Sequence, residues 1–136
     1  MENKRIDFTT AKLAKEKGFD FYDTGGYYHI NEGYSSGYSF CYSDVNEQTE
    51  GCLLCPDQSL LQKWLRGKRI DITVITDWRK GSRVYYVGFS FINDKNEIDI
   101  WFSKDEDKNK IEYSEYEDAL EIGLFESLQR VPETVA

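Results

Sequence analysis

A short amphipathic helix that carries its own start and stop signals constrains the fold of this chain more than any other segment. The helix is predicted over residues 56–67. Pro56 fits its first turn because it lacks a backbone N–H, and Gly67 fits the left-handed conformation that ends many helices. Four apolar side chains fall on one side between these signals: Leu60, Leu61, Trp64 and Leu65. Such a stripe needs a covering surface, so this helix must pack against another part of the fold.

The size and composition of the chain favour one folded domain. Its 136 residues suffice for a single hydrophobic core, so we expect one domain over 1–136. Aromatic residues make up 15% of the chain, which argues against disorder. No apolar run reaches the roughly eighteen residues that cross a membrane, and the N-terminus lacks a secretory signal. We therefore expect no membrane contact. Three cysteines, an odd number, fit a reducing compartment, so we expect a cytoplasmic protein with no disulfide.

A short helix is predicted near the N-terminus, from Thr9 or Thr10 to about Lys17. One of the two threonines is expected to cap its first turn, since a hydroxyl oxygen can accept from a free backbone N–H there. Gly18 is the expected stop signal. The segment is only weakly amphipathic.

A longer helix is predicted near the C-terminus. Ser114 and Glu117 have the spacing of a capping box that opens it, and Pro132 ends it. Leucine or tyrosine recurs every four residues on one face: Tyr116, Leu120, Leu124 and Leu128. Gly123 beside this face costs about 1 kcal/mol of helix stability relative to alanine, which indicates close packing against another element.

Period-two patterns predict the strands. A hairpin is expected with strands near 27–30 and 38–43, and a polar loop over 44–51 leads to the middle helix. Three further strands with short turns between them are expected to form a meander: 70–74, 84–92 and 98–102. Residues 84–92 are apolar on both sides, which predicts that both faces of this strand are covered.

Adjacent strands separated by helices are typical of an α+β fold. The expected order is α-β-β-α-β-β-β-α. We expect an antiparallel sheet, made of the hairpin and the three-stranded meander, packed by two main helices and the short N-terminal helix.

Charge is unevenly distributed along the chain. The net charge is −8, and residues 93–136 contain thirteen acidic residues against five basic ones. Residues 63–83 show the opposite balance, with seven basic residues against two acidic ones. The molecule is therefore expected to be an electric dipole, and its basic region is a candidate for nucleic-acid contact.

Three segments carry a resemblance to a known family: residues 10–19, 56–66 and 116–124. In these segments, which occur in the same order, the chain resembles a family of small uncharacterised proteins encoded by bacteriophages and prophages of gut bacteria. The family has no assigned activity, so the resemblance implies a phage or prophage context inside a bacterial host. The chain departs from its relatives at Cys55, where they commonly have alanine.

The cysteines and the single histidine are candidate zinc ligands: His29, Cys41, Cys52 and Cys55. Cys52 and Cys55 have the two-residue spacing of a zinc knuckle, whereas the separations to His29 and Cys41 match no standard zinc finger. Free cysteine is also common in ordinary cores. Buried thiols without metal are the simpler interpretation, and no cofactor is expected.

Sequence motifs for catalysis are missing. No Gly-x-Ser-x-Gly elbow accompanies His29, and Thr24-Gly25-Gly26 lacks the lysine and spacing of a phosphate-binding loop. The acidic run at 105–107 lacks a calcium-loop pattern. We therefore expect a protein that is not an enzyme.

A non-catalytic protein-interaction module is the function that the sequence favours, with a protein partner and with self-association as an alternative. Tyrosine is enriched at interfaces, and four tyrosines are candidate contacts: Tyr27, Tyr28, Tyr34 and Tyr38. The first alternative is a small nucleic-acid-binding protein that uses the Lys63–Arg83 region, with four leading candidates: Lys63, Arg66, Arg69 and Arg79. The second is an inhibitor whose acidic row, from Asp105 to Glu121, mimics phosphates.

Overall fold

The structure, a computed structural model, describes residues 4–19, 27–30, 38–41, 52–54 and 56–132, and for the segments between 27 and 54 it describes the backbone. Its elements are α1 (Phe8–Glu16), β1 (Tyr27–Ile30), β2 (Tyr38–Cys41), β3 (Cys52–Leu54), α2 (Gln58–Gly67), β4 (Ile70–Arg79), β5 (Ser82–Ile92), β6 (Ile98–Phe102) and α3 (Tyr116–Leu128). The predicted α+β class is confirmed. The order contains one strand more than predicted, β3, which lies between the predicted polar loop and the middle helix.

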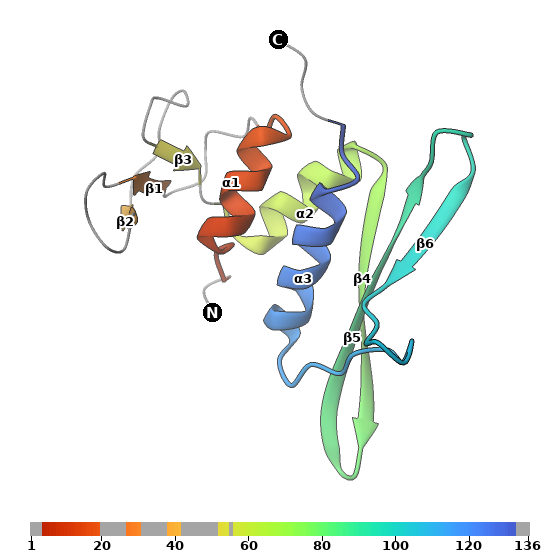
Figure 1. Cartoon of the computed structure of the whole chain (residues 1–136). Coiled ribbons are helices and arrows are strands. Elements are labelled where there is room, and N and C mark those ends of the chain that lie inside the picture. Colours follow the sequence, from red (N-terminus) through yellow and green to blue (C-terminus); the bar gives the residue numbers. More distant parts are fainter. Residues whose placement is uncertain (1–3, 20–26, 31–37, 42–51, 55, 133–136) are drawn as a thin grey trace.

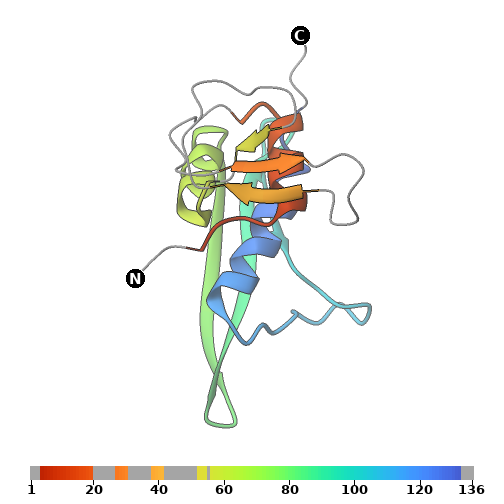
Figure 2. The same cartoon turned by 90° about the vertical axis from the view of Figure 1, so that its left-hand side faces the viewer.

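The strands form two antiparallel sheets of three strands, with orders β2-β1-β3 and β4-β5-β6. The predicted hairpin and meander therefore belong to two separate sheets and not to one. The hairpin gains β3 as its third strand, which pairs with β1. The helices lie between the two sheets, with α1 against β3 and with α2 and α3 against the second sheet (Figure 1). The view in Figure 2 shows the same layers from the side of the first sheet. Each sheet therefore turns only one face toward the helices.

The middle helix, α2, begins later than its proline suggested. Pro56 is buried before the helix, and the side chain of Asp57 caps it by accepting from the backbone N–H of Leu60 at 2.8 Å. Gly67 does not take the left-handed conformation. Arg69 does, with φ of 65°, because the turn into β4 reverses two residues beyond the glycine.

The caps of the other two helices also differ from the predictions. Asp7, not a threonine, stands at the N-cap of α1, while Gly18 ends the turn after it with φ of 91°, as predicted. Glu115 stands at the N-cap of α3 and no side chain caps it, so the capping box of Ser114 and Glu117 does not form. Local spacing alone did not locate these helix starts.

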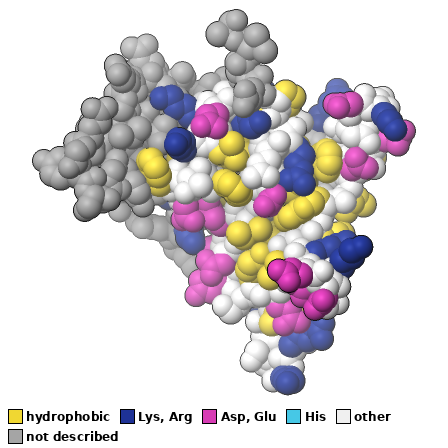
Figure 3. All heavy atoms as spheres, in the orientation of Figure 1, with side chains coloured by type: hydrophobic (Ala, Val, Ile, Leu, Met, Phe, Trp, Pro, Cys, Tyr) yellow, Lys and Arg dark blue, Asp and Glu magenta, His cyan; other side chains and the backbone are white. Residues whose placement is uncertain are grey.

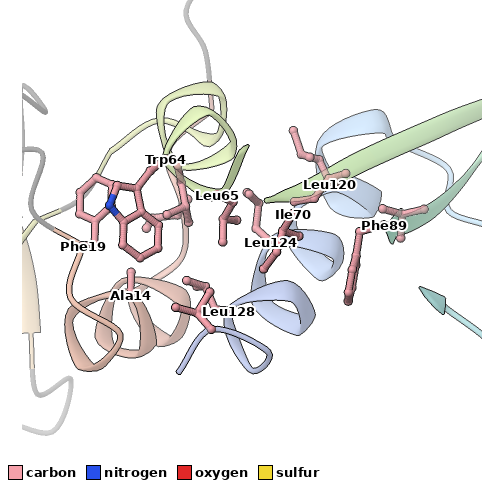
Figure 4. Close-up of a cluster of buried hydrophobic side chains, with 14 of the residues drawn as sticks. Ala14, Phe19, Trp64, Leu65, Ile70, Phe89, Leu120, Leu124 and Leu128 are labelled. Atoms are coloured by element: carbon pink, nitrogen blue, oxygen red, sulfur yellow. The ribbon is translucent and has the colours of Figure 1, made fainter. Parts of the chain in front are cut away.

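One hydrophobic cluster fills the space between the helices and the second sheet. Figure 4 shows it running from Phe19 and Trp64, whose rings meet edge to face at 5.6 Å, to Phe89 on β5. The predicted stripe of α3 is buried at Leu120, Leu124 and Leu128, whereas Tyr116 at its start is exposed.

Gly123 packs as closely as the sequence predicted. A Cβ atom at this position would lie 2.7 Å from Cγ2 of Val87 and 3.0 Å from Cγ2 of Ile72. The glycine thus brings the backbone of α3 directly onto β4 and β5, and it fixes the spacing between the helix layer and the second sheet.

Candidate functional site

The predicted zinc ligands belong to the first sheet and to a segment outside the described residues. His29 is the register partner of Cys52 across β1 and β3, and Cys41 is the partner of Tyr27 across β1 and β2. The side chains of all three, and Cys55 entirely, fall outside the part that the structure describes. Within that part no three side chains of the metal-binding types come together. Zinc binding stays a prediction.

The candidate tyrosines lie in the same region. Tyr27 and Tyr28 belong to β1 and Tyr38 to β2, but their side chains are outside the description, as is Tyr34 altogether. The prediction that these rings bind a partner is therefore untested.

The predicted basic region divides into two groups. Lys63, Arg66 and Arg69 lie along α2 and the turn that follows it, whereas Arg79 lies at the far end of β4. Because β4 has ten residues and a strand rises about 3.3 Å per residue, the two groups are separated by about 30 Å. They do not form one continuous patch.

The second group consists of Arg79, Lys80 and Arg83 at the tip of the β4–β5 hairpin, which extends beyond α3 (Figure 1). Lys and Arg side chains mark this lower end of the molecule in Figure 3. Trp78 is 61% exposed there, and the guanidinium of Arg83 lies 5.0 Å from the centre of its ring. The arrangement offers a ring and a cation in solvent, the combination that contacts nucleic acid in many proteins.

Arg79 is engaged within the molecule. Its Nη2 donates to the hydroxyl oxygen of Tyr86 at 3.0 Å, and its Nε lies 3.2 Å from Oε1 of Glu112. The hydrogen bond with Tyr86, and then the charges of Tyr86 and Glu112, raise the pKa of Arg79 above its ordinary value. Arg79 thus helps to hold the segment after β6 against the second sheet.

Four acids of the predicted row make contacts within the protein. Asp105 accepts from the backbone N–H groups of Asp107 and Asn109 and so closes its own loop, and Glu112 is paired with Arg79. Asp118 lies 3.4 Å from Nζ of Lys4. Glu121 points inward. The remaining acids of the row are exposed: Glu106, Asp107, Glu115 and Glu117. Phosphate mimicry by this row stays a prediction.

Glu121 is the centre of a buried polar network that joins the three helices. Its Oε2 accepts from the backbone N–H of Asp7 at 3.1 Å and from the hydroxyl of Thr10. Its Oε1 accepts from Nε2 of Gln58 at 3.1 Å, and the same Nε2 donates to the carbonyl oxygen of Glu117 at 2.8 Å. Because the donors satisfy the carboxylate, the network is structural. Sequence reasoning missed it, although Glu121 lies three residues before the buried Leu124 and so shares its helix face.

The outer face of the second sheet, which points away from the helices, carries exposed isoleucines. Residue pairs in the register share a face, so Ile92 lies beside Ile98, and Ile100 follows two positions along β6 on the same side. Ile98 is 73% exposed, Ile100 68% and Ile92 41%. We name these three residues the isoleucine patch. The prediction that both faces are covered concerned residues 84–92, where Tyr86 and Val87 are buried on opposite faces and Ile92, at the end of the strand, is exposed. For residues 98–102 a period of two groups side chains on a common face without identifying which face the helices cover.

The surroundings of the isoleucine patch differ at its two ends. The charged β5–β6 turn borders one end, and hydrophobic side chains reach the surface beside that turn in Figure 3. At the other end the ring of Phe102 lies over Gly88, and Nζ of Lys110 sits 4.4 Å from the ring centre. An apolar centre within a polar rim is the usual anatomy of a protein interface. The arrangement can bury apolar surface of a partner.

Neither a membrane-spanning helix in the described ranges nor a known relative adds to this description of the site. Among the helices that the structure describes, none is long and apolar enough to cross a membrane. Comparison with known proteins gave no match to a family model, a curated protein or a solved structure. The candidate function therefore rests on the geometry of this chain and on the resemblance in its three sequence segments.

Proposed function

We propose that this chain is a non-catalytic protein-interaction module that contacts its partner through the isoleucine patch. The observation that supports the proposal most directly is the exposure of Ile98 and Ile100, at 73% and 68%, beside Ile92 on one sheet face. Single exposed apolar residues are common on protein surfaces. Three adjacent isoleucines on two neighbouring strands are less common, and they favour a contact surface.

The magnitude of burial supports a partner of protein type. Complete burial of an isoleucine side chain contributes about 1.5–3 kcal/mol, so covering Ile98 and Ile100 from their present exposure contributes roughly 1–2 kcal/mol each. Association costs at least about 4 kcal/mol, and the partner must therefore supply further contacts on the rim. A polypeptide surface offers both the apolar centre and the polar rim.

The biological context of this module comes from the sequence. The three segments that resemble phage and prophage proteins support an accessory role inside a bacterial host, in the cytoplasm.

Covalent capture tests this proposal. A photo-crosslinking residue replaces Ser90, which lies beside Ile100 across the strands, and the tagged chain is irradiated in a gut-bacterium lysate. We expect one recurrent crosslinked protein, lost in the double variant Ile98→Thr/Ile100→Thr and retained in Ile75→Thr. Ile75 is a matched control because it lies on the same outer face, opposite Tyr86, and has the same 41% exposure as Ile92. An identical set of crosslinks with the double variant would refute the proposal.

Nucleic-acid binding is the second candidate, and the exposed Trp78 with Arg83 beside it at the hairpin tip favours it. A gel-shift series with mixed DNA and RNA at rising salt tests this function. Retention at low salt that disappears in Trp78→Ala/Arg83→Ala, but not in Lys63→Ala/Arg66→Ala on α2, supports binding at the tip. Free migration of both nucleic acids at low salt excludes it. The phosphate-mimicking inhibitor has less support, because several acids of its row are paired or buried.

A further inference from the structure

Strand β6 lies at one edge of the second sheet, next to β5. The N–H of Ser103 donates to the carbonyl oxygen of Val87 at 3.1 Å, and the N–H of Asn93 donates to that of Glu97 at 2.9 Å. Because alternate residues of an antiparallel strand direct their backbone groups to opposite sides, Asp99 and Trp101 face β5. The backbone groups of the other strand residues face away from it: Ile98, Ile100 and Phe102. No described strand pairs with this side of β6.

The opposite edge of the same sheet, strand β4, is covered by a helix. Helix α2 packs beside β4, and Nε2 of Gln62 donates to the carbonyl oxygen of Ile72 at 3.2 Å. A side chain of the protein thus occupies a backbone acceptor of β4. Natural proteins usually protect sheet edges by cover, charge or proline. β6 contains no proline, its outer-face side chains are apolar, and its one charged residue, Asp99, lies on the helix face, while Lys110 reaches over the ring of Phe102.

We propose that two copies of this chain pair through the free edges of β6, antiparallel, about a two-fold axis at Ile100. In this register Ile100 lies opposite Ile100 of the second copy, and Ile98 lies opposite Phe102. Each outward N–H of these residues then meets an outward carbonyl oxygen, because they form the hydrogen-bonded pairs of an antiparallel ladder. The result is a continuous six-stranded sheet with an isologous interface.

The side chains fit the same register. On the outer face the pairing places apolar residues beside apolar residues, so the two isoleucine patches join into one surface. The inference rests on the proposed function in this respect, since the joined surface is the one offered to the protein partner. Cross-strand pairs of branched and aromatic side chains are also favourable in themselves.

Charge complementarity favours a second copy over an unrelated strand. Asp99 of one copy comes opposite Trp101 of the other, and the guanidinium of Arg130 lies 5.7 Å from the centre of that Trp101 ring. The carboxylate of Asp99, which accepts from Nδ2 of Asn93 at 2.9 Å, thereby approaches the guanidinium of Arg130 in the other copy, where Glu126 already lies 3.1 Å from it. Asp99 would thus add a second carboxylate to that guanidinium. At the end of the strand Glu97 comes opposite Ser103 and thus next to Lys104 of the other copy. Both contacts occur twice because of the two-fold axis.

Sedimentation equilibrium of the full chain tests the pairing. We expect a mass of twice 15.9 kDa at high concentration and dissociation on dilution, with a dissociation constant on the order of 10–100 µM because one strand pair is a small interface. Ile100→Lys places a charge at the centre of the edge and should weaken the dimer at least about tenfold. Ile75→Lys, on the same face but on β4, should change it less than about threefold. A wild-type mass that stays at 15.9 kDa overturns the proposal.

Amide exchange of the wild-type chain gives an independent readout that does not depend on folding of a variant. We expect the outward amides of Ile98, Ile100 and Phe102 to exchange slowly at high concentration and rapidly on dilution. The inward amides of Asp99 and Trp101 should stay protected at both concentrations. Exchange of the outward amides that is independent of concentration contradicts the pairing.

The two proposals fail separately. A monomeric chain that still loses its crosslinked partner in Ile98→Thr/Ile100→Thr retains the proposed function and loses the dimer. A chain that pairs through β6, but whose crosslinks to other proteins do not depend on these isoleucines, retains the dimer and loses the proposed function.

Discussion

Replacement of Gly123 by alanine tests the contact on which the layered arrangement depends. In a solvent-exposed helix this change stabilises by about 1 kcal/mol, because glycine loses more backbone entropy on folding than alanine does. In α3 the new Cβ would lie 2.7 Å from Cγ2 of Val87, roughly 1 Å closer than the optimum for two carbon atoms. The two effects have opposite signs, so the sign of the measured change shows which one is larger.

The surroundings of Val87 decide the magnitude. Val87 is 1% exposed and lies on β5, between β4 and β6, so its side chain cannot move away without displacing a strand that is paired on both sides. Overpacking of this kind costs about 1–3 kcal/mol, which exceeds the propensity gain and leaves a net loss of about 1 kcal/mol. With a urea m-value of about 2 kcal/mol per M, the unfolding midpoint falls by roughly 0.5 M.

The assay is urea unfolding followed by tryptophan fluorescence, with two companion variants. Gly67→Ala is the control, because no atom lies within 4 Å of a Cβ there, and it should stabilise by up to about 1 kcal/mol. In a Val87→Ala background the closest contact is gone and the 3.0 Å approach to Cγ2 of Ile72 remains, so adding Gly123→Ala should cost less than in the wild type. If Gly123→Ala stabilises as much as Gly67→Ala does, the close approach of α3 to β5 is refuted.

Four further predictions follow from single contacts. Glu121→Ala removes the acceptor of the Thr10 hydroxyl and of the N–H of Asp7, and one of the two acceptors of Nε2 of Gln58. It should lower the free energy of unfolding by about 2–4 kcal/mol, whereas Glu117→Ala, which removes an exposed side chain, should change it by less than about 0.5 kcal/mol. Equal losses in urea unfolding would contradict the network. Asp57→Ala removes the cap of α2 and should cost about 1 kcal/mol, with Asp57→Asn restoring most of it, as measured by thermal unfolding. Gly88→Ala places a Cβ 2.6 Å from the carbonyl oxygen of Trp101, which is a backbone atom and cannot easily move. The substitution should lower the free energy of unfolding by at least about 2 kcal/mol and speed amide exchange in β6. Unchanged exchange there would disprove the contact. Ile98→Thr/Ile100→Thr should change the free energy of unfolding, measured in urea, by less than about 0.5 kcal/mol, because threonine keeps the β-propensity and both positions are exposed. A large loss would show that these isoleucines stabilise the fold.

Patterns between neighbouring residues predicted the local structure well. The stripe of α2, the leucines of α3 and the close packing at Gly123 all follow from side-chain spacing and size, and the structure confirms them. Helix starts were predicted less well. Helix α2 begins where the side chain of Asp57 caps it, and helix α3 begins after Glu115, whose backbone is extended. Alternative N-caps one or two residues away have similar energies, so spacing alone does not choose between them.

Features that depend on distant segments were not predictable from spacing. The network of Glu121 needs α1, α2 and α3 in place, and Thr10 took part in it instead of capping a helix. The separation of the basic residues into two groups depends on the full length of β4, which continues to Arg79, well beyond the predicted 70–74. The candidate site was missed for the same reason, since only the position of the helix layer decides which side of β6 is covered.

The position of the helices also explains why the isoleucine patch points to a contact. With all three helices between the sheets, the second sheet obtains its core on one face from Ile72, Val87 and Phe89. On the opposite face Tyr86 is buried and Phe102 packs over Gly88. The exposed positions beyond them need β-propensity but no apolar side chains, and threonine would supply that at lower risk of aggregation. Ile98 and Ile100 therefore add an exposed apolar surface that the fold itself does not require. Their retention at an edge that no described strand covers fits the proposals that a second copy covers that edge and a partner covers that face.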